Sequence, residues 1–337
     1  MIHYSPFQLF HRRPSDVSQR SLNVVFSKAS MRRRYEVWFL RLGLADGSGA
    51  WWFRYLLLNP GRRWGGGCPG NPRGQPVEVW ATWFPRGSRP LSLIQGFSQN
   101  QLTRSATGAG PFYFQVRENR LDEDSCAGCL DVDGHEVRWN LRYRSTLAVT
   151  LSEVGWIGFA RTPHSDAVFS GEITLDGRTF RGQRLGFGVQ GHNCGYRHRR
   201  LWNWAHCAFL DAKGGGLSTF EALEYELPFG MRFRKALLWH RGALYTFRRL
   251  VGICRDRENL QWVFRCSNPA EGTALVAILD GRGPSLHRLP YLTTDCAESF
   301  PVANNSLARA TLIFSRSGHP LEEIHTDGGA ALEMVGS

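Results

Sequence analysis

The sequence predicts an all-β protein with two antiparallel domains. Short apolar or alternating runs, separated by turn residues, recur along the 337-residue chain, while helical periodicity is weak throughout. Aromatic residues, which suit pleated strands and apolar pocket walls, reach 12%. Strands at such turn-marked intervals favour sandwiches or barrels over units that alternate strands with helices. Because closing a sheet removes its edges, we expect two antiparallel barrels.

The chain begins with a stretch that shows no structural period. Residues 1–33 are rich in Ser and Arg, and Met31 stands directly before the first strong pattern. Unanchored termini are usually poorly ordered, so we expect an N-terminal extension over 1–33. The natural start could be Met31.

The clearest strand of the first domain lies at 136–143. Val137, Trp139, Leu141 and Tyr143 alternate there with polar residues, which is the period of a half-buried strand. Further strands are expected at 51–59, 77–84 and 112–117. Asp-Gly pairs at 133–134 and 176–177 predict hairpin turns, because such turns need positive φ angles.

A polar, proline-containing stretch at 161–166 predicts the boundary between the domains. The N-terminal barrel is therefore expected at 34–160, the C-terminal barrel at 165–325, and a tail at 326–337. Expected strands of the second barrel are 201–210, 243–250, 261–266, 273–279 and 310–315.

Composition limits the location and the partners of the chain. Lys and Arg outnumber Asp and Glu by 41 to 29, a formal charge of +12. This suits nucleic acid, anionic lipid or an acidic substrate, or reflects only a coding preference for arginine. The sequence has no run of about 18 apolar residues and no signal-peptide pattern. We expect a cytoplasmic protein with free thiols among its eight Cys, and peripheral membrane contact stays open.

The densest group of chemically active residues lies at 186–206. It reads Gly-Phe-Gly-Val-Gln-Gly-His-Asn-Cys-Gly at 186–195 and Trp-Asn-Trp-Ala-His at 202–206. A strand through the second segment would place Trp202, Trp204 and His206 on one face.

These motifs resemble the AttH-like family, which is similar to carotenoid 1,2-hydratases, tocopherol cyclases and lipocalin-like Diels–Alderases. The resemblance rests on Gly-Xaa-Gln-Gly-His-Asn-Xaa-Gly at 188–195, Trp-Xaa-Trp-Ala-His at 202–206 and Phe-Glu-Ala at 220–222. It covers about residues 34–320, and the weaker matches in the first half are 35–38, 52–55, 79–81 and 139–141.

The resemblance implies two packed lipocalin-like barrels with an apolar pocket within or between them, and no metal or organic cofactor. It implies a hydratase, cyclase or pericyclase acting on a large isoprenoid, polyene or polyketide molecule. A carrier of a hydrophobic ligand is the alternative, because one fold hosts many functions. Cys194 stands where the family usually has Trp, which makes the pocket wall smaller there and adds a thiol.

Glu221 is the expected catalytic acid, in the position where the family places one. Alkene hydration needs an acid in a dry pocket, and burial raises a carboxyl pKa. His192 is expected to share or orient its proton. The alternatives are a structural carboxylate paired with Arg54, and a core imidazole bonded to the backbone.

The remaining expected site residues bind the substrate. They are Asn193, Cys194, Trp202, Trp204, His206, Arg54 and Glu36. The last two could instead form a buried salt bridge that sets strand register.

Three further chemistries receive little support from the spacing. Cys126 and Cys129 form a lone CxxC, and zinc would need two more ligands such as His192 and Cys194. Cys194 as a nucleophile lacks an assigned third member. The basic run at 197–200 beside two Trp could bind single-stranded nucleic acid. We expect no metal, no cofactor and no nucleic acid; the partner is a hydrophobic small molecule.

Overall fold

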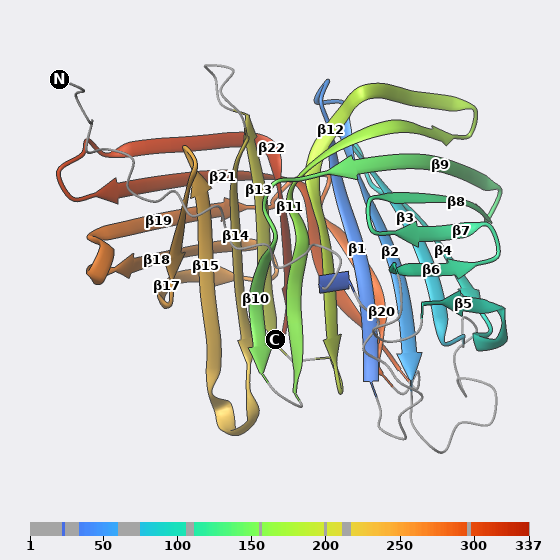
Figure 1. The fold of residues 1–337 in the computed structure, drawn as a ribbon, viewed down its shortest axis with the longest axis horizontal. Helices are drawn as coiled ribbons and strands as arrows, with labels where there is room; N and C mark the ends of the chain where they lie inside the picture. Colours follow the sequence, from blue (N-terminus) through green and yellow to red (C-terminus); the bar gives the residue numbers. More distant parts are fainter. Residues whose placement is uncertain are drawn as a thin grey trace, which may run out of the picture.

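The protein is all-β, as predicted. The computed structural model describes residues 22–23, 34–59, 75–105, 111–154, 157–198, 201–210, 217–294 and 298–336. Within these residues, 22 strands form two sheets, every strand pair is antiparallel, and the other regular elements include three short 3-10 helices (Figure 1). Of the expected N-terminal extension at 1–33, all but Leu22 and Asn23 lie outside the described residues.

The first sheet has twelve strands, in the order β4-β3-β2-β1-β12-β11-β9-β8-β7-β6-β5, with β10 paired to β11. Their bounds are β1 Arg34–Leu44, β2 Gly49–Asn59, β3 Val77–Pro85, β4 Leu91–Phe97, β5 Leu102–Arg104, β6 Tyr113–Val116, β7 Asn119–Asp122, β8 Ser125–Val132, β9 His135–Arg144, β10 Val149–Val154, β11 Gly158–Leu175 and β12 Arg178–Gly195, with a 3-10 helix at Gln99–Gln101. The sheet curls until β4, at one edge, contacts β8.

The second sheet has ten strands, in the order β16-β15-β14-β13-β22-β21-β19-β18-β17, with β20 paired to β21. Their bounds are β13 Trp202–Leu210, β14 Leu217–Glu226, β15 Arg232–His240, β16 Ala243–Phe247, β17 Arg249–Asp256, β18 Gln261–Asn268, β19 Thr273–Asp280, β20 His287–Leu292, β21 Ser299–Arg316 and β22 Glu322–Val335, with 3-10 helices at Pro228–Gly230 and Pro269–Glu271. It also curls, as the contact between the edge strand β17 and β15, near the opposite edge, shows.

Local patterns predict most of the expected strands and both Asp-Gly hairpins. The expected strand at 243–250 is wrong, because β16 ends at residue 247 and β17 begins at residue 249. The alternating run at 136–143 forms most of β9, and its apolar side chains enter the core of the first sheet. Both Asp-Gly pairs adopt the expected turns, with φ of 53° and 81° at Asp133 and Gly134, and 48° and 82° at Asp176 and Gly177.

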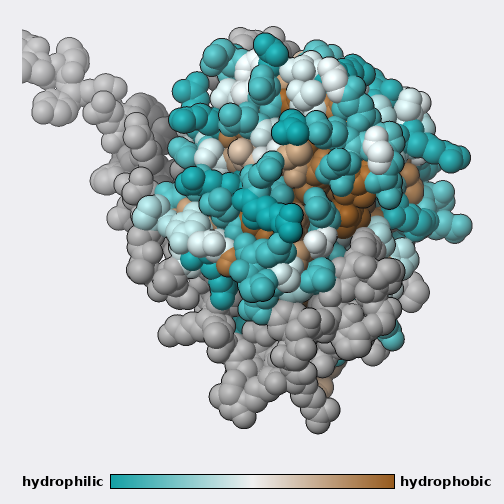
Figure 2. Space-filling view, turned by 90° about the vertical axis from the view of Figure 1, so that its right-hand side faces the viewer, coloured by the Kyte–Doolittle hydropathy of each residue, from teal (hydrophilic) through white to brown (hydrophobic). Residues whose placement is uncertain are grey.

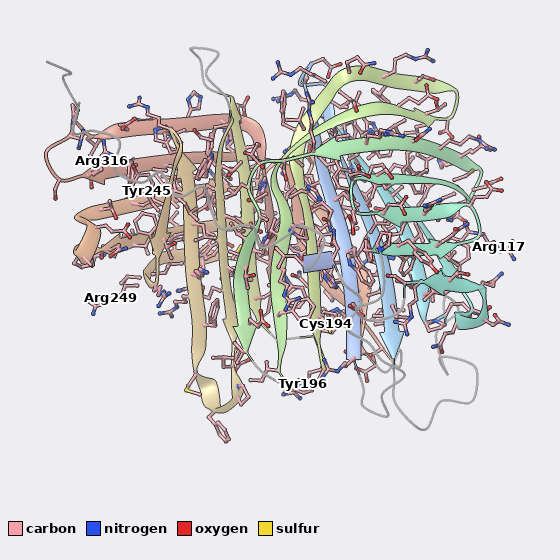
Figure 3. The ribbon with its side chains drawn as sticks, in the orientation of Figure 1. Arg117, Cys194, Tyr196, Tyr245, Arg249 and Arg316 are labelled. Carbon is pink, nitrogen blue, oxygen red and sulfur yellow. The ribbon has the colours of Figure 1, made fainter. Side chains whose placement is uncertain are left out.

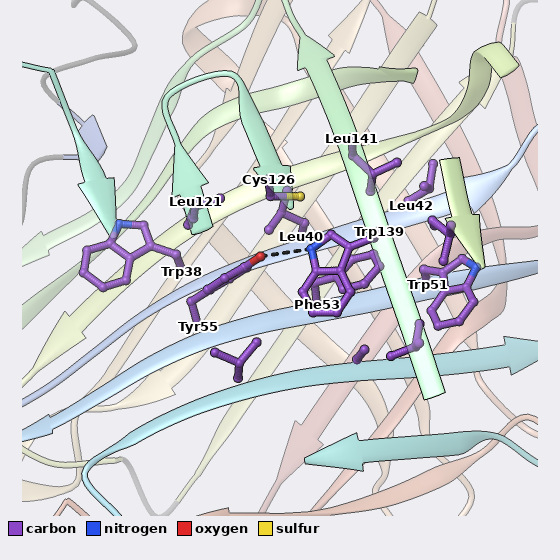
Figure 4. Packing of buried hydrophobic residues seen from close by; sticks show 14 of the residues in the cluster. Trp38, Leu40, Leu42, Trp51, Phe53, Tyr55, Leu121, Cys126, Trp139 and Leu141 are labelled. Carbon is purple, nitrogen blue, oxygen red and sulfur yellow. Dashed lines mark hydrogen bonds between the residues drawn. The ribbon is translucent and has the colours of Figure 1, made fainter. Parts of the chain in front are cut away.

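The core of the first barrel is largely aromatic. Trp51, Phe53 and Trp139 are buried within it, and the Trp139 indole donates a 3.1 Å hydrogen bond to the Tyr55 hydroxyl (Figure 4). This bond satisfies a polar group that would otherwise be costly to bury.

The division of the chain differs from the predicted one. The long hairpin of β11 and β12 belongs to the first sheet, because β11 pairs with β9 and β12 pairs with β1. The first sheet therefore ends at residue 195, and the Gly-His-Asn-Cys-Gly motif lies in it. Residues 326–335, predicted as a tail, belong to β22 and pair with β13 and β21.

The stretch at 161–166 is not a linker but the bulged middle of β11. Register shifts fall between Arg161 and His164 and between His164 and Ala167. Its polar side chains bond to the segment beside it: His164 to Ser145, and the Asp166 carboxylate to the backbone N–H of residues 146 and 147. Polar residues that resemble a loop in sequence are thus paired inside the fold.

The two sheets pack face to face through a mixed apolar cluster. Phe39, Trp52 and Val189 of β1, β2 and β12 belong to it together with Trp204 and Leu223 of β13 and β14. Figure 1 shows these long strands running side by side through the middle of the molecule. The end formed by the first sheet is mainly hydrophilic, with apolar residues in one patch (Figure 2). Within the described residues, every helix is too short or too polar to cross a membrane.

Candidate functional site

A cavity lies between the two sheets, where their packing is incomplete. It leaves about 930 Å³ of unfilled space, part of which is its open mouth. Its apolar wall comes from both sheets and includes Phe39, Trp52, Leu151, Phe159, Trp204 and Leu223. A predominantly apolar, concave site with a few polar groups is the usual form of a small-molecule pocket.

Glu221 of β14 is one of two buried carboxyls in the wall of this cavity, and Glu333 is the other. The Oε1 atom of Glu221 accepts hydrogen bonds from the Trp204 indole at 3.0 Å and from the Thr162 hydroxyl at 2.9 Å. In the part of the chain that the structure describes, Oε2 has no hydrogen-bond partner. The carboxyl therefore joins the two sheets, because Thr162 belongs to β11 of the first.

Burial raises the pKa of Glu221 from 4.5 to about 7. The hydrogen bonds from Trp204 and Thr162 and the positive charge of Lys235 lower this pKa, but they do not offset the loss of solvent. Near neutral pH this carboxyl holds a proton in a substantial share of molecules. That is the state a general acid needs.

The strand β13 forms as expected, but the side chains of Trp202, Trp204 and His206 have different hydrogen-bond partners. Trp204 donates to Glu221 and Trp202 donates to Glu333, at 2.8 Å, so both indoles hold carboxyls of the cavity wall. His206 lies beside Glu221 in the strand register and bonds through Nε2 to the Ser165 carbonyl at 2.8 Å. Burial lowers the pKa of His206 to about 3, so its imidazole is neutral.

His192 and Glu36 are brought together, but away from Glu221. Their Nε2 and Oε1 atoms are 3.0 Å apart, His192 Nδ1 lies 2.7 Å from the Leu22 carbonyl, and the ring stacks on Trp38 at 4.6 Å. Both side chains lie on the face of β1 and β12 that is turned towards the first barrel. The expectation that His192 orients the acid does not fit this geometry; Thr162 and Trp204 contact the acid instead.

The expected salt bridge between Glu36 and Arg54 does not form. Strand alternation sends the Arg54 side chain to the cavity, where its guanidinium carbon lies 3.7 Å from the Tyr291 ring centre and 4.8 Å from that of Trp80. Nor does Arg54 pair with Glu221. The alternative reading of Glu221 as a structural carboxylate held by Arg54 is therefore wrong.

Asn193 and Cys194 line the cavity near the end of β12, at the lower edge of the molecule where Figure 3 labels Cys194 and Tyr196. Burial raises the pKa of the Cys194 thiol to about 12, so almost no thiolate exists at neutral pH. This argues against Cys194 as a nucleophile.

The lone CxxC has the wrong geometry for a shared metal. Cys126 and Cys129 lie three positions apart on β8, so strand alternation points them to opposite faces. Among the described residues, no group of three or more His, Cys, Asp or Glu could hold a metal ion. Trp202 and Trp204 lie in the wall of the cavity between the sheets, and Trp204 is buried, so these two indoles do not form an exposed platform for nucleotide bases.

Sequence reasoning missed at least five polar residues of the cavity. These include Thr162 in the expected linker and Glu333 in the expected tail; Ser152, Tyr225 and Tyr291, in addition, carry no motif. Tyr225 and Ser152 bond to each other across the two sheets at 2.6 Å. Only Glu333 carried a signal, since it is a carboxyl inside the apolar run at 330–335.

Fold and site together define a two-barrel protein with a carboxyl-bearing apolar cavity between its sheets. Kievitone hydratase from Nectria haematococca has a similar structure, with a TM-score of 0.54, 12% identity and 94% of each chain covered. A candidate AttH from Nitrosomonas europaea aligns with a TM-score of 0.46 and 12% identity over 92% of this chain and 94% of that one. The expected resemblance is confirmed at the level of the fold. No family model and no curated protein matches the sequence.

Proposed function

We propose that this protein is a cofactor-free hydratase, with Glu221 as the acid that protonates a carbon–carbon double bond of an apolar substrate. The observation that carries the proposal is a buried carboxyl with a pKa of about 7 in the wall of an apolar cavity. The fold shared with kievitone hydratase is in keeping with it.

The chemistry needs one proton and one water. Glu221 gives its proton to the less substituted alkene carbon, and the positive charge develops on the more substituted one. The ring faces of Trp52, Phe39 and Trp204 stabilise that charge. Water then adds to the cation, and the Glu221 carboxylate takes back a proton, so the net change is addition of one water. A trisubstituted isoprenoid alkene suits this route best, because its cation is tertiary.

A cyclase and a carrier are the two alternatives to a hydratase; the cyclase would use the same acid, and the carrier would use none. A cyclase would let an internal alkene or hydroxyl capture the cation in place of water. A carrier would use only the apolar wall. The buried, protonated carboxyl favours chemistry over carriage, because a site for binding alone gains nothing from an acid that costs free energy to bury.

The test is turnover in oxygen-18 water. Alcohols and phenols that carry a trisubstituted isoprenoid alkene are incubated with the protein, and mass spectrometry follows the gain of labelled water. Glu221→Gln keeps the shape of the side chain but has no acidic proton, so turnover should fall by about 10²–10⁴-fold with affinity nearly unchanged. Glu271→Gln, at an exposed glutamate, is the matched control and should be fully active.

Two results would contradict the proposal. Full activity of Glu221→Gln would exclude proton transfer by this residue. Tight binding of the same compounds with no product in wild type would favour the carrier.

A further inference from the structure

Arg54 is a buried cation without a polar partner. Its side chain is 2% exposed, and the described residues offer it neither a hydrogen bond nor an ion pair. Its Nη1 is fully enclosed and unsatisfied. Because an unpaired buried charge is strongly unfavourable, a guanidinium in this state is unexpected unless a ligand completes it.

The polar atoms of Tyr291 and Trp80, whose rings contact Arg54, are already occupied. His198 also lines this cavity, and within the described residues neither of its ring nitrogens has a hydrogen-bond partner. The Tyr291 hydroxyl donates to Glu333 at 2.6 Å, and Glu333 also accepts from Trp202 and Asn304. The Trp80 indole donates to Glu78 at 2.9 Å. Arg54 meets the rings of Tyr291 and Trp80 rather than their polar atoms. The two rings stand nearly perpendicular to each other, at 87°, so at most one of them lies flat against the guanidinium plane. Neither ring offers a hydrogen-bond acceptor in its plane, and the Arg54 Nη1 atom keeps its N–H groups free for an acceptor from a ligand.

We propose that Arg54 anchors a second subsite of the cavity, which binds an ionised oxygen head group, a carboxylate or a phenolate, on an otherwise apolar ligand. Such groups match the planar fork of a guanidinium, which can donate two parallel hydrogen bonds to them. Both Arg54 and Glu221 line the same cavity, with Trp52 and Trp204 in the wall they share.

Two further guanidinium groups contact residues of the cavity wall. The Arg34 guanidinium lies 3.9 Å from the Cys194 sulfur, and that of Arg161 lies 4.1 Å from the Phe159 ring centre. Cys194 and Phe159 both line the cavity. Positive charge near a binding site raises the local concentration of anions. Two carboxylates oppose it: Glu153 accepts from Arg161 at 3.0 Å, and Glu333 of the cavity wall is held by three donors.

This subsite extends the proposed function. Binding of the head group does not depend on hydration; only the reaction at the double bond of the ligand's apolar chain rests on the proposed function. With its head group on Arg54, an amphiphile would lay its apolar chain along the indoles and bring its double bond towards Glu221. The substrate class is then an unsaturated amphiphile with an anionic head, such as a terpenoid carboxylate or a prenylated phenolate, rather than a pure hydrocarbon.

The experiment uses saturated ligands, so that it does not depend on any alkene chemistry. Laurate and 1-dodecanol compete with the neutral dye Nile red for the full-length protein at about pH 6, where laurate is ionised and most Glu221 keeps its proton. Wild type should bind laurate about ten- to hundredfold more tightly than dodecanol, the range expected for hydrogen bonds to charged groups.

The variants locate the preference. Arg54→Met should bind both ligands equally while still binding Nile red, which shows that the cavity persists. Arg54→Lys keeps the charge but loses the fork, so the preference should shrink without vanishing. Glu271→Gln, at an exposed glutamate outside the cavity lining, is the matched control and should keep the full preference.

Two outcomes would overturn the subsite. One is equal affinity of wild type for laurate and dodecanol, which needs no variant to fold. The other is a preference for laurate that survives in Arg54→Met or is as strong in Arg54→Lys as in wild type. Neither outcome bears on hydration, which Glu221→Gln tests in a separate assay.

Discussion

The raised pKa of Glu221 makes folding stability depend on pH in a defined way. The folded protein holds this proton up to about pH 7, whereas an unfolded chain releases it near 4.5. Between these values the folded state binds more protons, so stability contributed by the group is complete below about pH 4.5 and is lost as pH rises through 7. At about 1.4 kcal/mol per pKa unit, the loss is about 3 kcal/mol.

The assay is urea unfolding of wild type and Glu221→Gln from about pH 4.5 to about pH 8. Other groups titrate in this range. Burial lowers the pKa of His164 to about 4 and of His206 to about 3, and both effects make stability rise with pH below their unfolded values. They act equally in both proteins, so the difference between wild type and variant isolates Glu221.

The free energy of unfolding of wild type minus that of Glu221→Gln should fall by about 3 kcal/mol across this range. The control Glu271→Gln, at an exposed carboxyl, should show no such pH-dependent difference. A difference between wild type and Glu221→Gln that stays constant with pH would refute the reasoning, because it would mean that the buried carboxyl ionises normally.

Three further predictions concern the hydrogen bond to Glu221, the packing of His192 and an exposed hairpin tip. Thr162→Val removes a hydrogen bond that favours the Glu221 carboxylate, so the midpoint of the pH-dependent difference should move up by about one unit; an unchanged midpoint would exclude that bond. His192→Ala should cost about 2–4 kcal/mol in urea unfolding yet leave that midpoint in place, since the imidazole packs in the first barrel; a moved midpoint would couple it to the acid. At the tip of the hairpin between β14 and β15, Phe229 is 97% exposed and Met231 is 57% exposed. This exposure predicts contact with lipid surfaces. Replacing both with Ser should weaken sedimentation with anionic phosphatidylglycerol vesicles at least about tenfold, and equal sedimentation would contradict membrane contact there.

Strand positions and hairpin turns were open to prediction because both depend on neighbouring residues. Alternation at 136–143 sorts side chains into a buried and an exposed face whichever strand lies next to it. The turn at Asp133 and Gly134 depends on the backbone freedom of two residues. The all-β class therefore followed from sequence alone.

The division into two sheets could not be read in this way. Polar residues at 161–166 look like a linker until β11 is seen to bond them to the segment that precedes it. Pairing of β12 with β1 joins residues that are more than a hundred positions apart, and no local pattern encodes such a choice. Register across a sheet is decided by packing of its faces.

The site shows the same limit. Family resemblance singled out Glu221 as an acid, but its hydrogen bonds to Thr162 and Trp204 come from different sheets, and its pKa follows from burial between them. The register between β1 and β2 places Arg54 and Glu36 on opposite faces, because Arg54 lies opposite Phe39 and Glu36 lies opposite Leu57. The contact of Arg54 with the Tyr291 ring of β20 exists only because the sheets meet. Residue types along the chain determined which chemistry was available, and the tertiary packing decided which groups lose water and which partners they meet, because desolvation and hydrogen bonding depend on distances that the sequence does not contain.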